Sequence, residues 1–133
     1  MSLAISPLNT VAFYVEGIVE FNATTGVEDA ITTGTVTGFL ATSDAADATT
    51  ADATLSVSGV HVGGQTKPAS VGAGTWSNGT WMFRFLGSTL TLALLDTHFA
   101  TATPYLIVTR TGTIRAKVRL TYNRRTLAAT VEP

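Results

Sequence analysis

The sequence contains no cysteine, and this absence removes several chemistries at once. A disulfide framework, an iron–sulfur cluster, a cysteine zinc site and a thiol nucleophile all need that residue. The residues that commonly fill helix surfaces are also scarce, with 2 Lys, 4 Glu and 1 Gln among 133 residues. In their place stand 25 Thr, 18 Ala and 12 Gly. This composition favours a β-rich chain that forms one domain.

Long apolar runs are missing as well. The longest apolar stretches, at residues 92–95 and 105–108, fall far short of the ~20 residues that cross a bilayer. Residues 1–10 contain no Lys or Arg and are interrupted by Ser6, Pro7 and Asn9, which is not the pattern of a secretory signal. We therefore expect neither an export signal nor a transmembrane segment.

Apolar residues recur at every second position in several segments. Between Val11 and Phe21 the odd positions are apolar except for Gly17, and Ile18 is the one mismatch. Such alternation is typical of a strand buried on one face. The same pattern predicts strands at residues 35–41, 53–62, 81–85 and 90–94. A one-residue slip at Ser58-Gly59 predicts a bulge and a bend within the second of these four strands.

Turn signals separate the strands. Asn78-Gly79 predicts a type I′ hairpin turn, which would pair Trp76 with Trp81 across the two strands. Thr111-Gly112 joins residues 104–110 to a last strand at 113–122. Residues 42–52 hold three Asp and no large apolar side chain, so we expect a solvated loop there.

Together these patterns predict an all-β fold of seven or eight short strands, a single antiparallel β-sandwich. A small, partly closed β-barrel is the alternative. We expect an N-terminal arm at residues 1–10, the sandwich at 11–125 and a C-terminal tail at 126–133. The alternation places these residues in the core: Phe13, Val15, Val19, Phe21, Leu55, Val57, Phe83, Phe85, Leu92, Ile107, Val118 and Leu120.

Charge is divided along the chain. Residues 1–66 hold seven acids and no base, a charge of −7, whereas residues 67–133 hold eight bases and two acids, a charge of +6. One interpretation is that acidic and basic strands meet inside one fold, with Glu16 or Glu20 beside Arg115 or Arg119. The other is an interface with a partner of opposite charge. Its candidate residues are Glu16, Glu20, Glu28 and Asp29 for a basic partner, and Arg110, Arg115, Lys117, Arg119, Arg124 and Arg125 for an acidic one.

We call the six basic residues of this set the basic ladder. Nucleic acid is a less favoured partner for it than an acidic protein surface. The net charge of the chain is −1, and Tyr122 is the one aromatic residue that interrupts the ladder.

We find no catalytic, cofactor-binding or metal-binding constellation. His61 and His98 stand 37 residues apart without a metal-ligand spacing around either, and the sequence has no nucleophile-elbow or phosphate-loop motif. We therefore expect a protein that is not an enzyme. Trp76 and Trp81 are the candidate platform for stacking on a sugar ring, although two Trp at the end of a hairpin more often cover the core.

The order of elements resembles that of small immunoglobulin-like proteins that tailed bacteriophages carry on their virions. The resemblance covers residues 11–125 and lies in the leading strand from Phe13 to Phe21, the turn 23–26, the Thr-rich strand 34–40, the strand 79–85 and the closing hairpin 105–114. The loop at residues 42–52 is longer than the compact pattern of such proteins.

The resemblance implies a head decoration (cement) protein, or a tail or baseplate accessory. Such a protein is made in the host cytoplasm, acts on the virion, and binds a major capsid or tail protein lattice in many symmetric copies or as a homo-oligomer. It needs no cofactor, and it acts through surfaces rather than through a site. A carbohydrate-binding module for host recognition is the alternative function.

Overall fold

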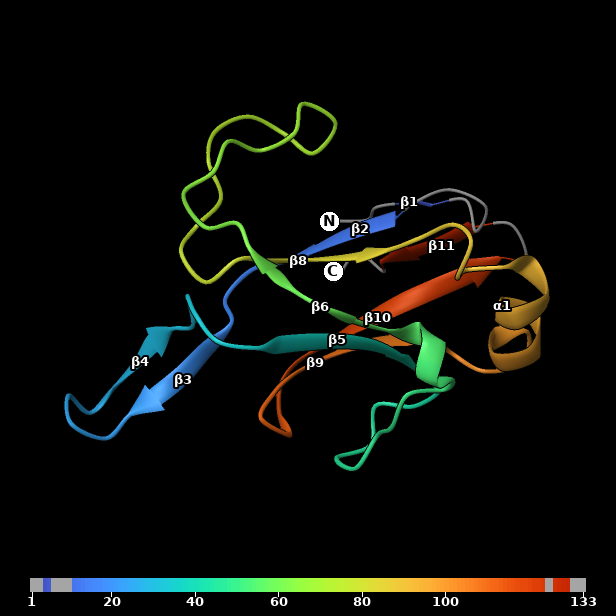
Figure 1. Ribbon diagram of the computed structural model, residues 1–133, viewed down its shortest axis with the longest axis horizontal. Helices are drawn as coiled ribbons and strands as arrows, with labels where there is room; N and C mark the ends of the chain where they lie inside the picture. Colours follow the sequence, from blue (N-terminus) through green and yellow to red (C-terminus); the bar gives the residue numbers. More distant parts are fainter. Residues whose placement is uncertain (1–3, 6–10, 124–125, 130–133) are drawn as a thin grey trace.

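The computed structural model (Figure 1) describes residues 4–5, 11–123 and 126–129. Its strands and helices follow in chain order: β1 (Ala4–Ile5), β2 (Val11–Val15), β3 (Val19–Asn22), β4 (Val27–Ala30), β5 (Val36–Ala41), the 3-10 helix η1 (Ala53–Leu55), β6 (Ser56–Ser58), β7 (Val60–His61), β8 (Trp81–Phe85), α1 (Leu92–Phe99), β9 (Tyr105–Arg110), β10 (Thr113–Asn123) and β11 (Thr126–Ala129).

The strands form three antiparallel sheets. Six strands pair in the order β1-β11-β10-β9-β5-β6, three in the order β2-β8-β7, and β3 pairs with β4. The expected all-β, antiparallel architecture is confirmed. The sheets are not closed into a barrel, so the barrel alternative is wrong.

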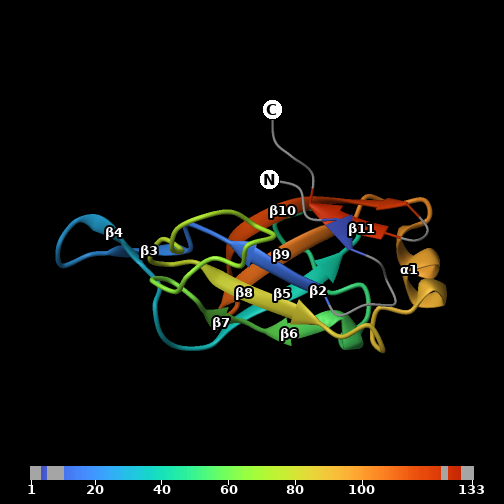
Figure 2. The same cartoon turned by 90° about the horizontal axis from the view of Figure 1, so that it is seen from above.

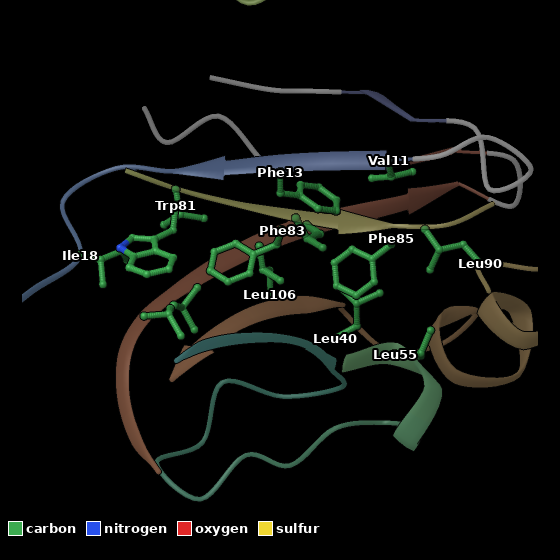
Figure 3. Close-up of a cluster of buried hydrophobic side chains, with 14 of the residues drawn as sticks. Val11, Phe13, Ile18, Leu40, Leu55, Trp81, Phe83, Phe85, Leu90 and Leu106 are labelled. Carbon is green, nitrogen blue, oxygen red and sulfur yellow. The ribbon is translucent and has the colours of Figure 1, made fainter. Parts of the chain in front are cut away.

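The three-stranded sheet lies across the larger sheet, and the main core lies between them (Figures 2 and 3). Phe13, Phe83 and Phe85 come from the small sheet and are 0–3% exposed. They face Leu40 and Leu106 of the large sheet, which are fully buried. Burial of a large apolar side chain contributes roughly 1.5–3 kcal/mol, so this layer dominates the stability of the fold.

The predicted bend at Ser58-Gly59 is the point where the chain changes sheets. Strand β6 ends at Ser58 beside β5, and β7 begins at Val60 beside β8. The amide of Gly59 donates a hydrogen bond to the carbonyl oxygen of Val36 at 2.6 Å. A Cβ on Gly59 would lie 2.6 Å from the Phe83 ring, and one on Gly38 would lie 2.5 Å from it. The Phe83 ring therefore occupies space that two missing side chains leave open.

The expected single strand at residues 11–21 is two strands in different sheets. Gly17, with φ of +74°, breaks the strand, and Ile18, the mismatch in the alternation, is fully buried. Beyond Ile18 the chain leaves the body, so Phe21 is 65% exposed and its placement in the core is wrong.

The strand expected at residues 90–94 is also wrong, because α1 begins at Leu92. The Thr91 hydroxyl accepts a hydrogen bond from the Leu94 amide and caps the helix. Leu95 and Phe99, four residues apart, point into the core, while Leu92 is 37% exposed, so its expected place in the core is wrong. The run of apolar residues at 92–95 fits either period, and burial of this i, i+4 pair selects the helix.

Asn78-Gly79 forms a turn, but not the predicted hairpin. The Thr80 amide donates to the Ser77 carbonyl oxygen at 3.2 Å, and Gly79 has φ of +83°. Asn78 does not have positive φ, which a type I′ turn requires. Trp81 pairs with Val15 and His61, whereas the Trp76 amide bonds to the Gln65 carbonyl, so the two Trp are not cross-strand partners.

The closing hairpin is confirmed as β9 and β10, joined by Thr111 and Gly112 with φ of 48° and 80°. Strand β10 carries a β-bulge at Arg115, because Ile114 pairs with Thr109 and Ala116 with the adjacent Val108. The predicted alternation holds from Ala116 to Leu120 and fails before the bulge.

The other expected core residues are largely confirmed. Phe13, Val15, Leu55, Phe83, Phe85, Ile107 and Leu120 are buried, and Val19, Val57 and Val118 are half-buried. In the segments placed in the arm and tail, Ala4–Ile5 and Thr126–Ala129 are strands that pair with each other at one edge of the large sheet. The remaining arm and tail residues lie outside the described part of the chain.

Residues 42–52 form the expected loop, which ends at Asp52, the cap of η1. The Asp52 carboxylate accepts hydrogen bonds from the Thr54 backbone N–H and the Thr54 hydroxyl, and His98 Nε2 lies 3.8 Å from it. These hydrogen bonds, led by the one from the backbone N–H, hold the pKa of Asp52 below its ordinary value.

We predict that Gly38→Ala destabilises the fold by ~1–3 kcal/mol, because the added Cβ must displace the Phe83 ring. Phe83→Leu removes ring atoms from the same space, so the double variant should lose less than the sum of the two single losses. Urea denaturation of the four proteins measures this coupling. Strictly additive losses would show that Gly38 and Phe83 do not compete for space.

The lowered pKa of Asp52 gives this carboxylate a pH-dependent contribution to stability. The contribution is present above the unfolded value of ~3.9 and is lost as pH falls through the lower folded value. We expect carbon-detected NMR to show Asp52 titrating below ~3.9, and Thr54→Ala to raise its pKa only partway, because the backbone N–H remains. Titration of Asp52 at or above the ordinary value in the unaltered protein would contradict this assignment.

Candidate interaction surface

The β3–β4 hairpin, residues 19–30, projects from the body at one end of the longest axis (Figures 1 and 2). Its strands pair only with each other. At its tip the Asn22 side-chain oxygen accepts hydrogen bonds from the amides of Thr24 and Thr25, and the Gly26 amide bonds to the Asn22 carbonyl. A two-stranded hairpin is marginally stable alone, so its attachment to the body decides whether it keeps this shape.

Backbone and side-chain bonds fix the two ends of the hairpin. The Ile18 amide donates to the Gly79 carbonyl at 3.1 Å, and the Ile31 amide donates to the Ile18 carbonyl at 2.8 Å. Trp81 Nε1 donates to the Ile31 carbonyl at 2.8 Å. Because both Ile side chains are at most 1% exposed, the hairpin leaves the body from a buried, hydrogen-bonded base.

A charged cluster supports the base from the closing hairpin. Arg110 Nη1 donates to Glu20 Oε1 at 2.5 Å, and Arg115 Nη2 lies 3.7 Å from Glu20 Oε2. The bulge at Arg115 makes this possible, since it turns this side chain away from the face that carries Lys117. The expectation that acidic and basic strands meet within the fold is confirmed for Glu20 and Arg115.

The hairpin exposes two large apolar side chains. Phe21 is 65% exposed and Val27 is 55% exposed. Phe21 pairs directly with Glu28 across the strands, so these two side chains share one face. On the other face the Asn22 side-chain amide donates to Asp29 at 2.7 Å. Glu28 and Asp29 are both exposed, which gives the hairpin an apolar and acidic surface.

The remaining candidate charges do not form one patch. Lys117 Nζ donates to the Asp44 carbonyl oxygen in the loop that covers the outer face of the large sheet. Arg119 is exposed and makes no ion pair with any described residue, and Glu16 is exposed at the break between β2 and β3. Arg124 and Arg125 lie outside the described residues. The basic ladder is therefore divided: Arg110 and Arg115 contact Glu20 at the hairpin base, whereas Lys117 and Arg119 lie on the outer side of β10.

The candidate sugar platform is not exposed. Trp76 and Trp81 are 5% and 3% exposed. Trp76 stacks on Tyr14, with ring centroids 4.6 Å apart, and Lys67 Nζ lies 5.0 Å from the Trp76 ring centre. The Trp81 ring sits at the hairpin base with His61 against it. Neither indole presents a face on which a sugar could stack.

An open cavity of about 510 Å³ lies at the end of the molecule opposite the β3–β4 hairpin. It forms where the chain leaves α1 and runs beside the end of β10. Phe99, Pro104 and Leu120 line it and are buried, and Arg119 stands exposed at the same cavity. Tyr122 also lines it and donates to the Asp96 carboxylate at 2.7 Å. We call this cavity the end pocket.

Sequence reasoning found Glu28, Asp29 and Arg119 by their charge and missed Phe21, whose position in an alternating run resembles that of a core residue.

Within the described residues no group of three or more His, Asp and Glu could hold a metal ion. In the same part of the chain, no helix is long and apolar enough to span a membrane. No protein-family model, curated protein or solved structure matches the chain.

We predict that Glu20→Gln loosens the hairpin base by up to about 1 kcal/mol, because Arg110 and Arg115 lose their shared, half-exposed carboxylate. Amide hydrogen exchange should accelerate in residues 19–30 while the exchange of Phe83 and Phe85 is unchanged. The matched control is Glu28→Gln, since the Glu28 side chain is exposed and forms no hydrogen bond or ion pair with any described residue, so this change should leave exchange unaltered. Equal exchange in all three proteins would show that the cluster does not hold the hairpin.

Proposed function

We propose that this chain is a non-enzymatic structural protein of a bacteriophage virion, a capsid decoration (cement) protein that binds and stabilises the assembled shell. Its two packed antiparallel sheets support, as part of the proposal, an immunoglobulin-like sandwich. The resemblance of its strand order to virion accessory proteins is the starting point.

The β3–β4 hairpin is the observation that carries the proposal. An aromatic ring that is 65% exposed, on a hairpin anchored to a buried base, adds little buried apolar area to the monomer. Exposed apolar groups with a polar rim mark sites of protein interaction. The hairpin is held in one shape before any partner arrives, which reduces the entropy lost on docking.

Binding of this kind stabilises a shell by mass action. A protein that binds the assembled lattice and not its free subunits shifts the equilibrium toward assembly. Many copies on one lattice act together even where each contact is weak. The acidic residue Glu28 beside Phe21 adds a salt-sensitive part to the contact.

A tail or baseplate accessory is the second form of the same proposal, because the hairpin suits any protein lattice. The carbohydrate-binding alternative has no exposed aromatic platform at Trp76 or Trp81 to support it.

The test mixes the full chain with undecorated phage heads and measures co-sedimentation and the temperature of head disruption. We expect saturable binding, a higher disruption temperature, and weaker binding at higher ionic strength. Phe21→Ser should weaken binding roughly tenfold or more, since burial of this side chain at the contact is worth about 1.5 kcal/mol.

Val60→Ser is the matched control, because Val60 is 51% exposed but lies on β7 rather than on the hairpin. It should bind as the unaltered chain does. Absence of binding by the unaltered chain to heads and to tails would overturn the proposal. Equal binding by the hairpin variant would remove the hairpin from it.

A further inference from the structure

The two ends of the molecule carry complementary surfaces. The β3–β4 hairpin and α1 lie at opposite ends of the longest axis in both views (Figures 1 and 2), and the end pocket is lined by the residues that directly follow α1. The hairpin therefore cannot reach the pocket of its own chain. A second copy placed end to end brings the two surfaces together.

Each of the two surfaces combines apolar groups with a charged group, and the two charges are opposite. Phe21 and Glu28 share one face of the hairpin, an aromatic ring beside a carboxylate. The end pocket presents small side chains, among them the exposed Ala100 and the half-exposed Ala102, beside the exposed guanidinium of Arg119, while the buried Phe99, Pro104 and Leu120 add little exposed surface. A volume of about 510 Å³ accommodates an aromatic side chain.

Several other charged groups that the structure describes near these surfaces are already engaged within the fold. Asp96 accepts the hydroxyl of Tyr122, which lines the pocket, at 2.7 Å. On the hairpin, Asp29 accepts from Asn22, and Glu20 is held by Arg110 and Arg115. Among the described residues, Glu28 and Arg119 are thus the exposed side chains of opposite charge, one at each end, that form no hydrogen bond or ion pair with another described residue.

We propose that the β3–β4 hairpin of one copy docks in the end pocket of the next copy, with Phe21 against Ala100 and Ala102 and Glu28 facing Arg119. This contact uses the same Phe21 face that the proposed function assigns to the shell, so the neighbouring copy and the shell are alternative partners of the hairpin. The contact is head-to-tail, so repeated contacts build a ring or an open row of copies.

The contact is weak when a single pair of copies meets. A hairpin in a pocket buries less than the ~800 Å² per partner of a standard interface. In solution the association therefore rises with protein concentration, and on a lattice that holds many copies it becomes effective.

Sedimentation velocity of the full chain, without shells, is the first test. We expect the weight-average mass to rise above 13.9 kDa as concentration increases. Phe21→Ser should keep the protein monomeric over the same range, and Val60→Ser should associate like the unaltered chain. Circular dichroism of each variant establishes that it is folded.

A charge reversal tests which surfaces meet. Glu28→Arg and Arg119→Glu should each raise the dissociation constant roughly tenfold or more, because each places like charges at the contact. An equimolar mixture of the two variants should associate again, since every contact in an alternating row then joins opposite charges. The chain that carries both changes should associate for the same reason.

The outcomes separate this inference from the proposed function. Association that the charge-reversed mixture restores, without binding to heads or tails, supports the head-to-tail contact and overturns the virion role. Head binding that depends on Phe21, with a monomer at all concentrations and no restoration by the mixture, keeps the virion role and overturns the contact between copies. Self-association that Arg119→Glu leaves unchanged excludes the end pocket.

Discussion

The approach of the two sheets depends on one aromatic ring and two missing side chains. Phe83 is fully buried on the central strand of the small sheet, and its ring occupies the space where a Cβ on Gly38 or Gly59 would lie. Gly38 belongs to β5 of the large sheet, and Gly59 is the residue at which the chain passes from one sheet to the other. The same ring therefore sets the separation of the layers and the path of the crossover. Interiors packed at crystal-like density do not tolerate an extra atom at such a point.

The β3–β4 hairpin can project from the molecule because its base is fixed to the packed core. Ile18 and Ile31 are buried at the edge of the core, and their backbone bonds to each other and to Gly79 close the base of the hairpin. Trp81 supports this base through its indole N–H while it packs against the core on the same strand as Phe83. A two-stranded hairpin that would be marginal alone is thereby held as an extension of the core. Its apolar residues stay exposed because nothing in the described chain folds back over them.

The acidic and basic halves of the chain are partly paired with each other inside the fold and partly exposed on its surface. Part of the charge is neutralised internally, because Glu20 from the acidic half meets Arg110 and Arg115 from the basic half at the hairpin base. The rest is exposed, with Glu28 and Asp29 on the hairpin and Arg119 at the end pocket. The bulge at Arg115 separates the paired from the exposed bases of β10, since a regular strand would have aligned Arg115 with Lys117 and Arg119 on the outer face. Because of this one extra residue in β10, Arg115 contacts Glu20 at the hairpin base, whereas Lys117 and Arg119 lie on the outer face of the sheet.

Local patterns in the sequence determined the β class, the strands β5, β8, β9 and β10, the Thr111-Gly112 turn and most of the core, because alternation and turn chemistry act over a few residues. Only the tertiary structure decided that residues 92–99 are a helix, that 56–61 divide between two sheets and that Phe21 is exposed. Each of these depends on what packs against the segment from elsewhere. Leu95 and Phe99 select the helix by entering a core that distant strands build, and Phe21 is exposed because the chain has already left that core at Ile18. Charge and composition indicated Glu28 and Arg119 as interface residues, whereas their positions at opposite ends of the molecule follow from the folded path of the chain.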